Sequence, residues 1–261
     1  MTQNHKKADQ YNDPKHNYLK YWDGRKYEHL AEELALKKLL KNKHFDCIVD
    51  VGGGYGRLSI LLENYADRVV LAEPSQQQLD IAKTFLKGHP KIERQLLQAD
   101  DLKFKSGSVD LVTMIRVMHH LPDPKAEFKE IARVLKPNAY AVIEVANYAH
   151  FLHRLKAASR LQKLPTTPVD IRSSANKTDN EIAFVNHNPK TVIKQLSQAG
   201  LAVEQVLSVS NLRNPKLKQL MPQPVMLSLE NVMQKPLSKL YFGPSIFFLV
   251  RKVDTSAKRP E

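Results

Sequence analysis

The sequence predicts a doubly wound α/β fold, in which helices cover both faces of a mostly parallel sheet. Residues 48–51 form a short apolar, β-branched run, which is the pattern of a strand buried on both faces. The runs at 68–73 and 108–116 repeat this pattern, and an amphipathic helical segment follows each of them. Strands that alternate with helices in this way build a parallel sheet, which binds its ligands at the carboxyl ends of the strands.

A glycine-rich turn follows the first strand. Four glycines occupy five positions: Gly52, Gly53, Gly54 and Gly56. Such glycines let the backbone approach a ligand closely, and the helix that begins after them offers unpaired N–H groups. A dinucleotide fingerprint is disfavoured, because Arg57 or Ser59 stands where its third glycine is required. The spacing present is Asp-x-Gly-x-Gly-x-Gly, beginning at Asp50. Because four glycines without a ligand would only weaken the junction, we expect a bound ligand here.

This spacing resembles motif I of the class I S-adenosylmethionine-dependent methyltransferases. The resemblance implies that S-adenosylmethionine is the cofactor, that the glycine loop accommodates its methionine part, and that Asp50 orients the loop. It also implies a role for Glu73, the acid that ends the second strand and precedes Pro74. An acid at this position is placed to accept hydrogen bonds from the ribose hydroxyl groups.

The third and fourth strands add further cofactor-binding candidates. Relatives carry a carboxylate or an amide after the third strand, where it holds the adenine amino group. That role falls to Asp100, beside Asp101, if the end of the strand sets the register. It falls to Gln98 if the register is counted back from Phe104. We favour Asp100, because a carboxylate accepts from an amino group without the orientation ambiguity of an amide. Arg116 leaves the carboxyl end of the fourth strand, where open sheets place their ligands.

Paired histidines follow the fourth strand, in a His-His-Leu-Pro-Asp-Pro segment that resembles the subgroup of ubiquinone and menaquinone methyltransferases. Adjacent residues rarely converge on one ion, and no cysteine or acidic cluster completes a zinc site, so we expect no metal. Structural roles are favoured for both histidines, although His119 could line the methyl-transfer pocket. His187 is a second pocket candidate, in a segment that resembles uncharacterised methyltransferases of the same subgroup. Either would act as a base only if the acceptor enters protonated.

The chain is expected to divide into five segments. They are an N-terminal tail with a cover helix (1–45), a cofactor-binding core (46–149), a lid insertion (150–187), the C-terminal part of the core (188–253) and a disordered tail (254–261). We expect residues 1–20 to be mobile and a helical insertion at 211–244. Two interpretations are open for the aromatic segment 21–27: it covers the site, as the resemblance implies, or its aromatic side chains only pack the helix onto the sheet. The family resemblance further implies seven strands, with the last strand antiparallel between the fifth and the sixth.

Composition limits the location and the partners. The 261 residues include 40 Lys and Arg against 27 Asp and Glu, so the net charge is +13. This charge favours acidic partners such as RNA, but the lysines are scattered, and a solvated basic surface is the preferred interpretation. No apolar run approaches the roughly 18 residues that a membrane span needs, and the N-terminus is polar, so we expect a cytoplasmic protein. A lone Cys47 excludes a disulfide framework.

Three functions follow from these features. We expect a methyltransferase that uses S-adenosylmethionine to methylate a small-molecule acceptor, because both insertions could enclose a modest substrate. An RNA methyltransferase is the first alternative, supported by net charge alone. A non-catalytic protein that keeps the cofactor site is the second. The insertions determine which acceptor binds, and neither their sequences nor fold analogy identifies it. The sequence does not predict the oligomeric state.

Overall fold

A seven-stranded sheet organises the chain, as a computed structural model describes it for residues 10–13, 18–174, 177 and 182–253. The strands are β1 (Phe45–Val51), β2 (Ala66–Glu73), β3 (Ile92–Leu96), β4 (Val109–Met114), β5 (Leu135–Ala146), β8 (Leu201–Val209) and β9 (Ser245–Lys252). Their order is β3-β2-β1-β4-β5-β9-β8. The pairs among β1 to β5 are parallel, and β9 is antiparallel to both β5 and β8. The predicted fold class is confirmed, including the position of the last strand.

The strand order reverses between β1 and β4, and this reversal positions the site. Chain connections run from β1 toward β2 and β3 on one side, and from β4 toward β5 on the other. The loops that leave the carboxyl ends of β1 and β4 therefore diverge and leave a crevice between them. Val51 pairs with Ala72 of β2 and with Met114 of β4, so the ends of all three strands lie at one level.

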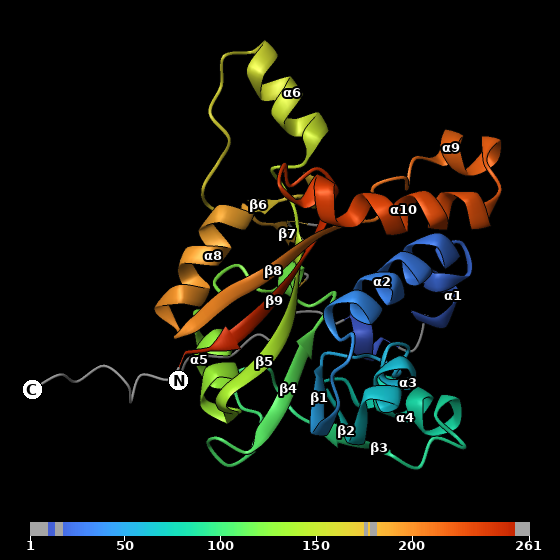
Figure 1. Cartoon of the computed structure of the whole chain (residues 1–261), viewed down its shortest axis with the longest axis vertical. Coiled ribbons are helices and arrows are strands. Elements are labelled where there is room, and N and C mark those ends of the chain that lie inside the picture. The colour runs from blue at the N-terminus through green and yellow to red at the C-terminus, as the bar shows by residue number, and fades with distance from the viewer. Residues whose placement is uncertain (1–9, 14–17, 175–176, 178–181, 254–261) are drawn as a thin grey trace, which may run out of the picture.

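Helices cover both faces of the sheet, as Figure 1 shows. One face packs against α2 (Lys26–Leu39), α3 (Ser59–Leu62), α4 (Gln76–Phe85) and α10 (Gln223–Ser238). The other face packs against α5 (Lys125–Val134) and α8 (Pro189–Gln198). Successive β1 residues alternate between the two layers, with Ile48 in the first and Val49 in the second. This alternation explains why neighbouring β1 residues such as Ile48 and Val49 are both apolar.

Both insertions contain helices. The first carries α6 (Phe151–Ser159), which has no buried residue and projects away from the sheet in Figure 1. This first insertion also contains a short antiparallel ribbon of β6 (Val169–Asp170) and β7 (Val185–Asn186), which the sequence pattern does not predict. The second insertion carries α9 (Pro215–Leu220) and α10.

Two segments differ from the expectation, and the structure does not test a third. The helix after the glycine loop is short, because α3 gives way to a 3-10 turn, η2 (Glu63–Tyr65). Within the predicted N-terminal tail, the 3-10 turn η1 (Gln10–Asn12) docks near the start of α4, ahead of the cover helix α1 (Tyr18–Asp23). The predicted disordered tail at 254–261 lies outside the described residues. Within the described part of the chain, no helix has the length and apolar character of a membrane span.

Candidate functional site

The glycine loop connects β1 to α3 and leaves no room for side chains. Gly52 has a φ of +63°, and a Cβ atom on it would lie 2.4 Å from Cγ2 of Val117. A Cβ atom on Gly53 would lie 2.4 Å from Cδ1 of Leu71 and 2.6 Å from the carboxylate of Asp50. Glycine is the one residue that combines the left-handed backbone of the first position with the contacts of both. The loop therefore exposes main chain rather than side chains to the crevice.

Asp50 ties this loop to the neighbouring strand. It is buried at the carboxyl end of β1 and accepts hydrogen bonds from the hydroxyl groups of Ser59 and Thr113, each at 2.7 Å. Burial raises the pKa of Asp50, and the two hydroxyl groups oppose that rise. Because Ser59 begins α3 and Thr113 belongs to β4, this carboxylate sets the position of the loop between them.

Glu73 joins the ends of β1 and β2. The backbone N–H of Gly54 donates to its Oε2 at 2.9 Å, and the N–H of Ser75 donates to its Oε1 at 3.0 Å. Its side chain is 5% exposed, whereas the following Pro74 is exposed. Two residues that the sequence predicts for the site are thus in direct contact.

The adenine candidates lie on an exposed turn after β3. Gln98, Asp100 and Asp101 are all exposed, and the N–H of Asp101 donates to the carbonyl of Gln98 at 3.1 Å. Asp101 also forms an ion pair with Lys103. The turn places both candidates at the carboxyl end of β3, so the choice of Asp100 over Gln98 stays a prediction.

Trp22 covers the glycine loop from the N-terminal side. Its side chain belongs to α1, and the guanidinium of Arg57 lies 3.6 Å from its ring centroid. Together with Arg116, Asp50 and the glycines, these residues line a pocket with about 360 Å³ of empty space, part of which is open to solvent. The indole Nε1 of Trp22 is buried and has no hydrogen-bond partner among the described residues. The aromatic segment predicted to cover the site thus contributes a wall of this pocket.

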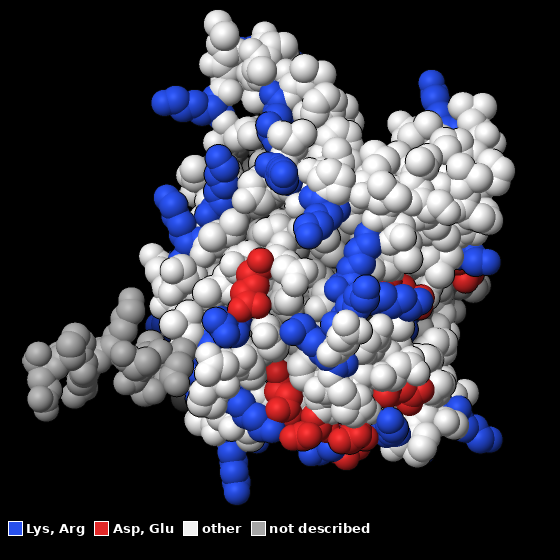
Figure 2. Space-filling model, in the orientation of Figure 1, with Lys and Arg blue, Asp and Glu red and all other residues white. Residues whose placement is uncertain are grey.

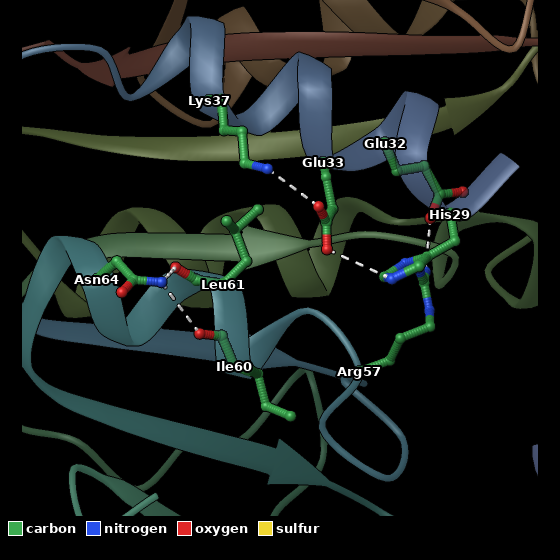
Figure 3. A network of polar contacts seen from close by, with 8 residues as sticks. All are labelled: His29, Glu32, Glu33, Lys37, Arg57, Ile60, Leu61 and Asn64. Carbon is green, nitrogen blue, oxygen red and sulfur yellow. Dashed lines mark hydrogen bonds and ion pairs between the residues drawn. The ribbon is translucent and has the colours of Figure 1, made fainter. Parts of the chain in front are cut away.

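A buried ion network supports this wall. Glu32 of α2 pairs with Arg57 at 2.5 Å and with Arg116 at 2.6 Å, and its side chain is fully buried. Burial acts to raise the pKa of Glu32, but the two guanidinium groups outweigh it and the pKa is lowered. The backbone of Arg116 is left-handed, with a φ of +64°, and its N–H donates to Glu144 at 3.1 Å. Figure 3 shows Glu32 beside Arg57, with His29 of the same helix between Arg57 and Glu33.

The sequence pattern predicts Arg116 as a site residue but not Glu32 or Arg57. A signal for Glu32 exists, because it lies four residues before the fully buried Leu36, on the apolar stripe of α2. A carboxylate on such a stripe requires a partner. The partner itself cannot be predicted from this helix, because it comes from a separate loop.

The histidines lie behind the crevice, around the 3-10 turn η3 (Met118–His120). Nε2 of His187 donates to the carbonyl of Met118 at 2.9 Å, and its side chain is 2% exposed. Nδ1 of His120 lies 3.0 Å from the carbonyl of Ala183, so it carries the proton. The ring of His119 packs 4.4 Å from that of Phe184. Burial lowers the pKa of both His119 and His187, so each is neutral near pH 7.

The docked N-terminal turn reaches the same crevice. The hydroxyl group of Tyr11 lies 2.8 Å from Nε2 of His120, which is the acceptor because Nδ1 carries the proton. Ser75 donates from its hydroxyl group to the carbonyl of Tyr11 at 2.7 Å. Residues 10–13 therefore bridge the loops that follow β2 and β4.

Comparison with known proteins places this geometry among the methyltransferases. Residues 49–143 match a family model described as a methyltransferase domain. The chain is 32% identical to a demethylmenaquinone methyltransferase of Clavibacter sepedonicus, over 59% of this chain and 65% of the relative. It is 25% identical to the uncharacterised methyltransferase YcgJ of Bacillus subtilis, over 50% of this chain and 56% of the relative. The chain spans about half the length of the curated relatives that it matches.

A solved structure shares the whole fold. It is a Listeria monocytogenes protein provisionally described as S-adenosylmethionine dependent methyltransferase, with a TM-score of 0.60 and 17% identity. The match covers 89% of this chain and 100% of that one. At 17% identity the similarity shows a shared fold alone, so this match assigns no function to the insertions around the crevice.

Proposed function

Because the chain belongs to the class I S-adenosylmethionine-dependent methyltransferases, we propose that it transfers a methyl group from S-adenosylmethionine to a small-molecule acceptor. The contact between Glu73 and the glycine loop is the observation that carries the proposal. It joins the group expected to bind the ribose to the loop expected to bind the methionine part. A glycine turn without a ligand would have no need of this carboxylate at its edge.

The residues present fit this cofactor. Side chains at Gly52 and Gly53 would clash with their surroundings, so the loop offers backbone N–H groups that a carboxylate accepts well. Trp22 also lines this pocket, and its buried indole N–H has no hydrogen-bond partner among the described residues. The positive charge of Arg116 borders the pocket and suits the carboxylate of the methionine part.

Each predicted cofactor-binding residue named below then has a specific role. Asp50 holds the glycine loop in place, Glu73 accepts hydrogen bonds from the ribose, and Asp100 accepts from the adenine, with Gln98 as the alternative. S-adenosylmethionine supplies an electrophilic methyl group when it is bound. The protein's contribution is to align an acceptor atom with that methyl group and to exclude water, as Trp22 and the docked N-terminal turn are placed to do.

His119 is the better of the two predicted bases. Nε2 of His187 is committed to the carbonyl of Met118, whereas no hydrogen bond of the His119 ring occurs within the described chain. A neutral imidazole accepts a proton from an acceptor that enters as an alcohol, phenol or ammonium group. An acceptor that enters deprotonated would need no such base.

A transfer assay tests the proposal. Purified protein is incubated with S-adenosylmethionine that carries a tritiated methyl group, together with small phenols, quinone precursors and amines in one set and bulk tRNA in another. We expect label in a small-molecule product, and much less product from Glu73→Ala at the same cofactor concentration. Label in tRNA alone would instead support the RNA methyltransferase alternative. A protein that binds the cofactor but labels nothing would support a non-catalytic role.

A further inference from the structure

Three arginines from separate parts of the chain gather beside the cofactor pocket. Arg25 precedes α2, Arg116 follows β4, and Arg213 lies in the loop after β8. The guanidinium of Arg25 lies 4.0 Å from the ring centroid of Tyr21, and that of Arg116 lies 5.6 Å from the ring centroid of Trp22. These two rings are themselves neighbours, with centroids 5.7 Å apart. Arg25 and Arg116 therefore flank one aromatic pair.

Arg213 joins this group through the start of α2. The N–H of Leu212 donates to the hydroxyl group of Tyr27 at 3.1 Å, so the next residue lies over the helix end that Arg25 precedes. The electrostatics agree with this placement. Partial loss of water contact lowers the pKa of Arg213, and the positive charges of Arg116 and Arg25 lower it further. The arginine cluster is defined here as Arg25, Arg116 and Arg213.

The nearby carboxylates are already engaged. Glu28 accepts two contacts from Lys218, at 2.7 and 2.8 Å. Glu32 is shared between Arg57 and Arg116, so this one carboxylate cannot neutralise both guanidinium groups. Glu144 accepts from the backbone of Arg116 and from Ser245, and burial raises its pKa.

Two members of the cluster have no acidic partner. Across the described residues, neither Arg25 nor Arg213 forms an ion pair with a carboxylate. Asp23 is exposed and lies near Tyr55. Burial raises the pKa of Tyr55, and the negative charge of Asp23 raises it further. His150 also lies near Arg213, but burial, the neighbouring His153 and Arg213 lower its pKa to about 4, so it brings no negative charge. The cluster is thus a concentration of positive charge that the nearby Glu28 offsets only in part.

Two members of the cluster lie outside the cofactor pocket and are accessible to solvent. Arg213 is exposed and Arg25 is half-buried, and neither lines the pocket beside the glycine loop. Figure 2 shows one face of the molecule, on which Lys and Arg side chains predominate over the upper half and acidic side chains gather lower down. Arg116 is the cluster member that also lines the cofactor pocket, so it connects the pocket to Arg25 and Arg213.

We infer that the arginine cluster binds an anionic group, a carboxylate or a phosphate, on the small-molecule methyl acceptor. Guanidinium groups match both anions with paired N–H donors, and their binding here would offset the mutual repulsion of three like charges. The inference rests on the proposed function, because the cluster adjoins the crevice where that function places the methyl group. It deepens the function by naming a chemical feature of the acceptor.

Calorimetry with simple anions tests this inference. The protein is first saturated with S-adenosylhomocysteine in low-chloride buffer, so that the cofactor's own carboxylate cannot be displaced by the probe. Inorganic phosphate, benzoate and the neutral analogue benzamide are then titrated separately. We expect phosphate or benzoate to bind and benzamide not to bind. The tighter of the two anions distinguishes a phosphate-bearing acceptor from a carboxylate-bearing one.

Variants of one exposed arginine give the matched comparison. Arg213→Gln should weaken anion binding about tenfold, the scale of one lost charge-assisted contact. Arg213→Lys should retain part of the affinity, because it keeps the charge but not the paired donors. Arg251→Gln, which removes an arginine paired with Glu204 at the outer edge of the sheet, should bind as the wild type does.

Four outcomes would overturn the inference. They are benzamide binding as tightly as benzoate, no anion binding to the wild type, unchanged binding in Arg213→Gln, and tRNA that displaces phosphate at micromolar concentration. The last outcome would assign the cluster to a nucleic-acid backbone. Failure of the proposed function is separable, because S-adenosylhomocysteine binding is measured first in the same sample. A wild type that binds this product but no anion contradicts only the present inference.

Discussion

Glu32 is the residue that links the cover of the site to the sheet. It belongs to α2, yet its carboxylate holds Arg57 from the glycine loop and Arg116 from the end of β4. A fully buried carboxylate is costly unless it is paired, and here two guanidinium groups share the compensation. The wall of the cofactor pocket therefore depends on a residue that no motif contains.

The residues of the motifs could be predicted, and their long-range partners could not. Asp50 and Glu73 stand at fixed spacings from a glycine turn and a strand end, so their positions beside the loop follow from local sequence. The charge of Arg116 acts on Arg213 only because β8 and β4 are brought into one sheet by β5 and β9. No local periodicity carries that information.

His150 gives a residue-scale prediction about pH. Its pKa is lowered to about 4 in the folded chain, first by burial and then by His153 and Arg213, from an ordinary value of 6.5. As the pH falls from 6.5 toward 4, the unfolded chain takes up a proton that the folded chain refuses, so the free energy of unfolding decreases. Above pH 6.5 this contribution is constant.

The His150→Gln variant isolates this effect. Urea unfolding at pH 7.5 and pH 5 gives the stability difference between wild type and variant at each pH. We expect the difference to shift against the wild type at pH 5, because the variant has no group that titrates at this position. A difference that is the same at both values contradicts the assigned direction.

At the scale of elements, the second insertion is attached through a buried polar contact. Glu230 of α10 accepts from the hydroxyl group of Tyr27 at 2.7 Å and from the N–H groups of Ser210 and Asn211 at 2.8 and 3.0 Å. Burial raises the pKa of this carboxyl group. One side chain thus joins α10, α2 and the loop that leads to Arg213.

Replacement of Glu230 should loosen this junction. Glu230→Ala leaves at least two buried donors without an acceptor, so we expect a loss of at least about 2 kcal/mol in the free energy of unfolding. Glu230→Gln keeps one acceptor oxygen and should lose less. Urea unfolding measures both, with the surface variant Glu204→Gln as the control. A Glu230→Ala protein as stable as the wild type would contradict this account of the attachment.

Elements with clear periodicity are the ones that the sequence predicts well. The central strands β1, β2 and β4 contain apolar runs between turn residues, and α8 has Asn188 as its N-cap and Pro189 at its first position. The short ribbon of β6 and β7 has two residues in each strand, which is too few to show an alternation. The early end of α3 and the docking of η1 likewise depend on tertiary contacts rather than on local pattern.

At the scale of the whole molecule, sheet order and charge act together. The reversal between β1 and β4 opens a crevice, and the loops after β1, β4 and β8 bring arginines toward it. Part of the net charge of +13 is therefore concentrated beside this crevice rather than scattered over the surface. The same fold that positions a cofactor site also concentrates the positive charge assigned here to acceptor binding.

The central claim is that the Glu73 and glycine-loop site binds S-adenosylmethionine. Isothermal titration calorimetry with S-adenosylmethionine and S-adenosylhomocysteine tests it directly, on the wild type, Glu73→Ala and the surface control Glu93→Ala, whose ion pair with Arg68 is exposed. We predict micromolar dissociation constants for the wild type and the control, and binding weakened at least about tenfold, or 1.4 kcal/mol, in Glu73→Ala. A folded wild type that binds neither compound would contradict the account.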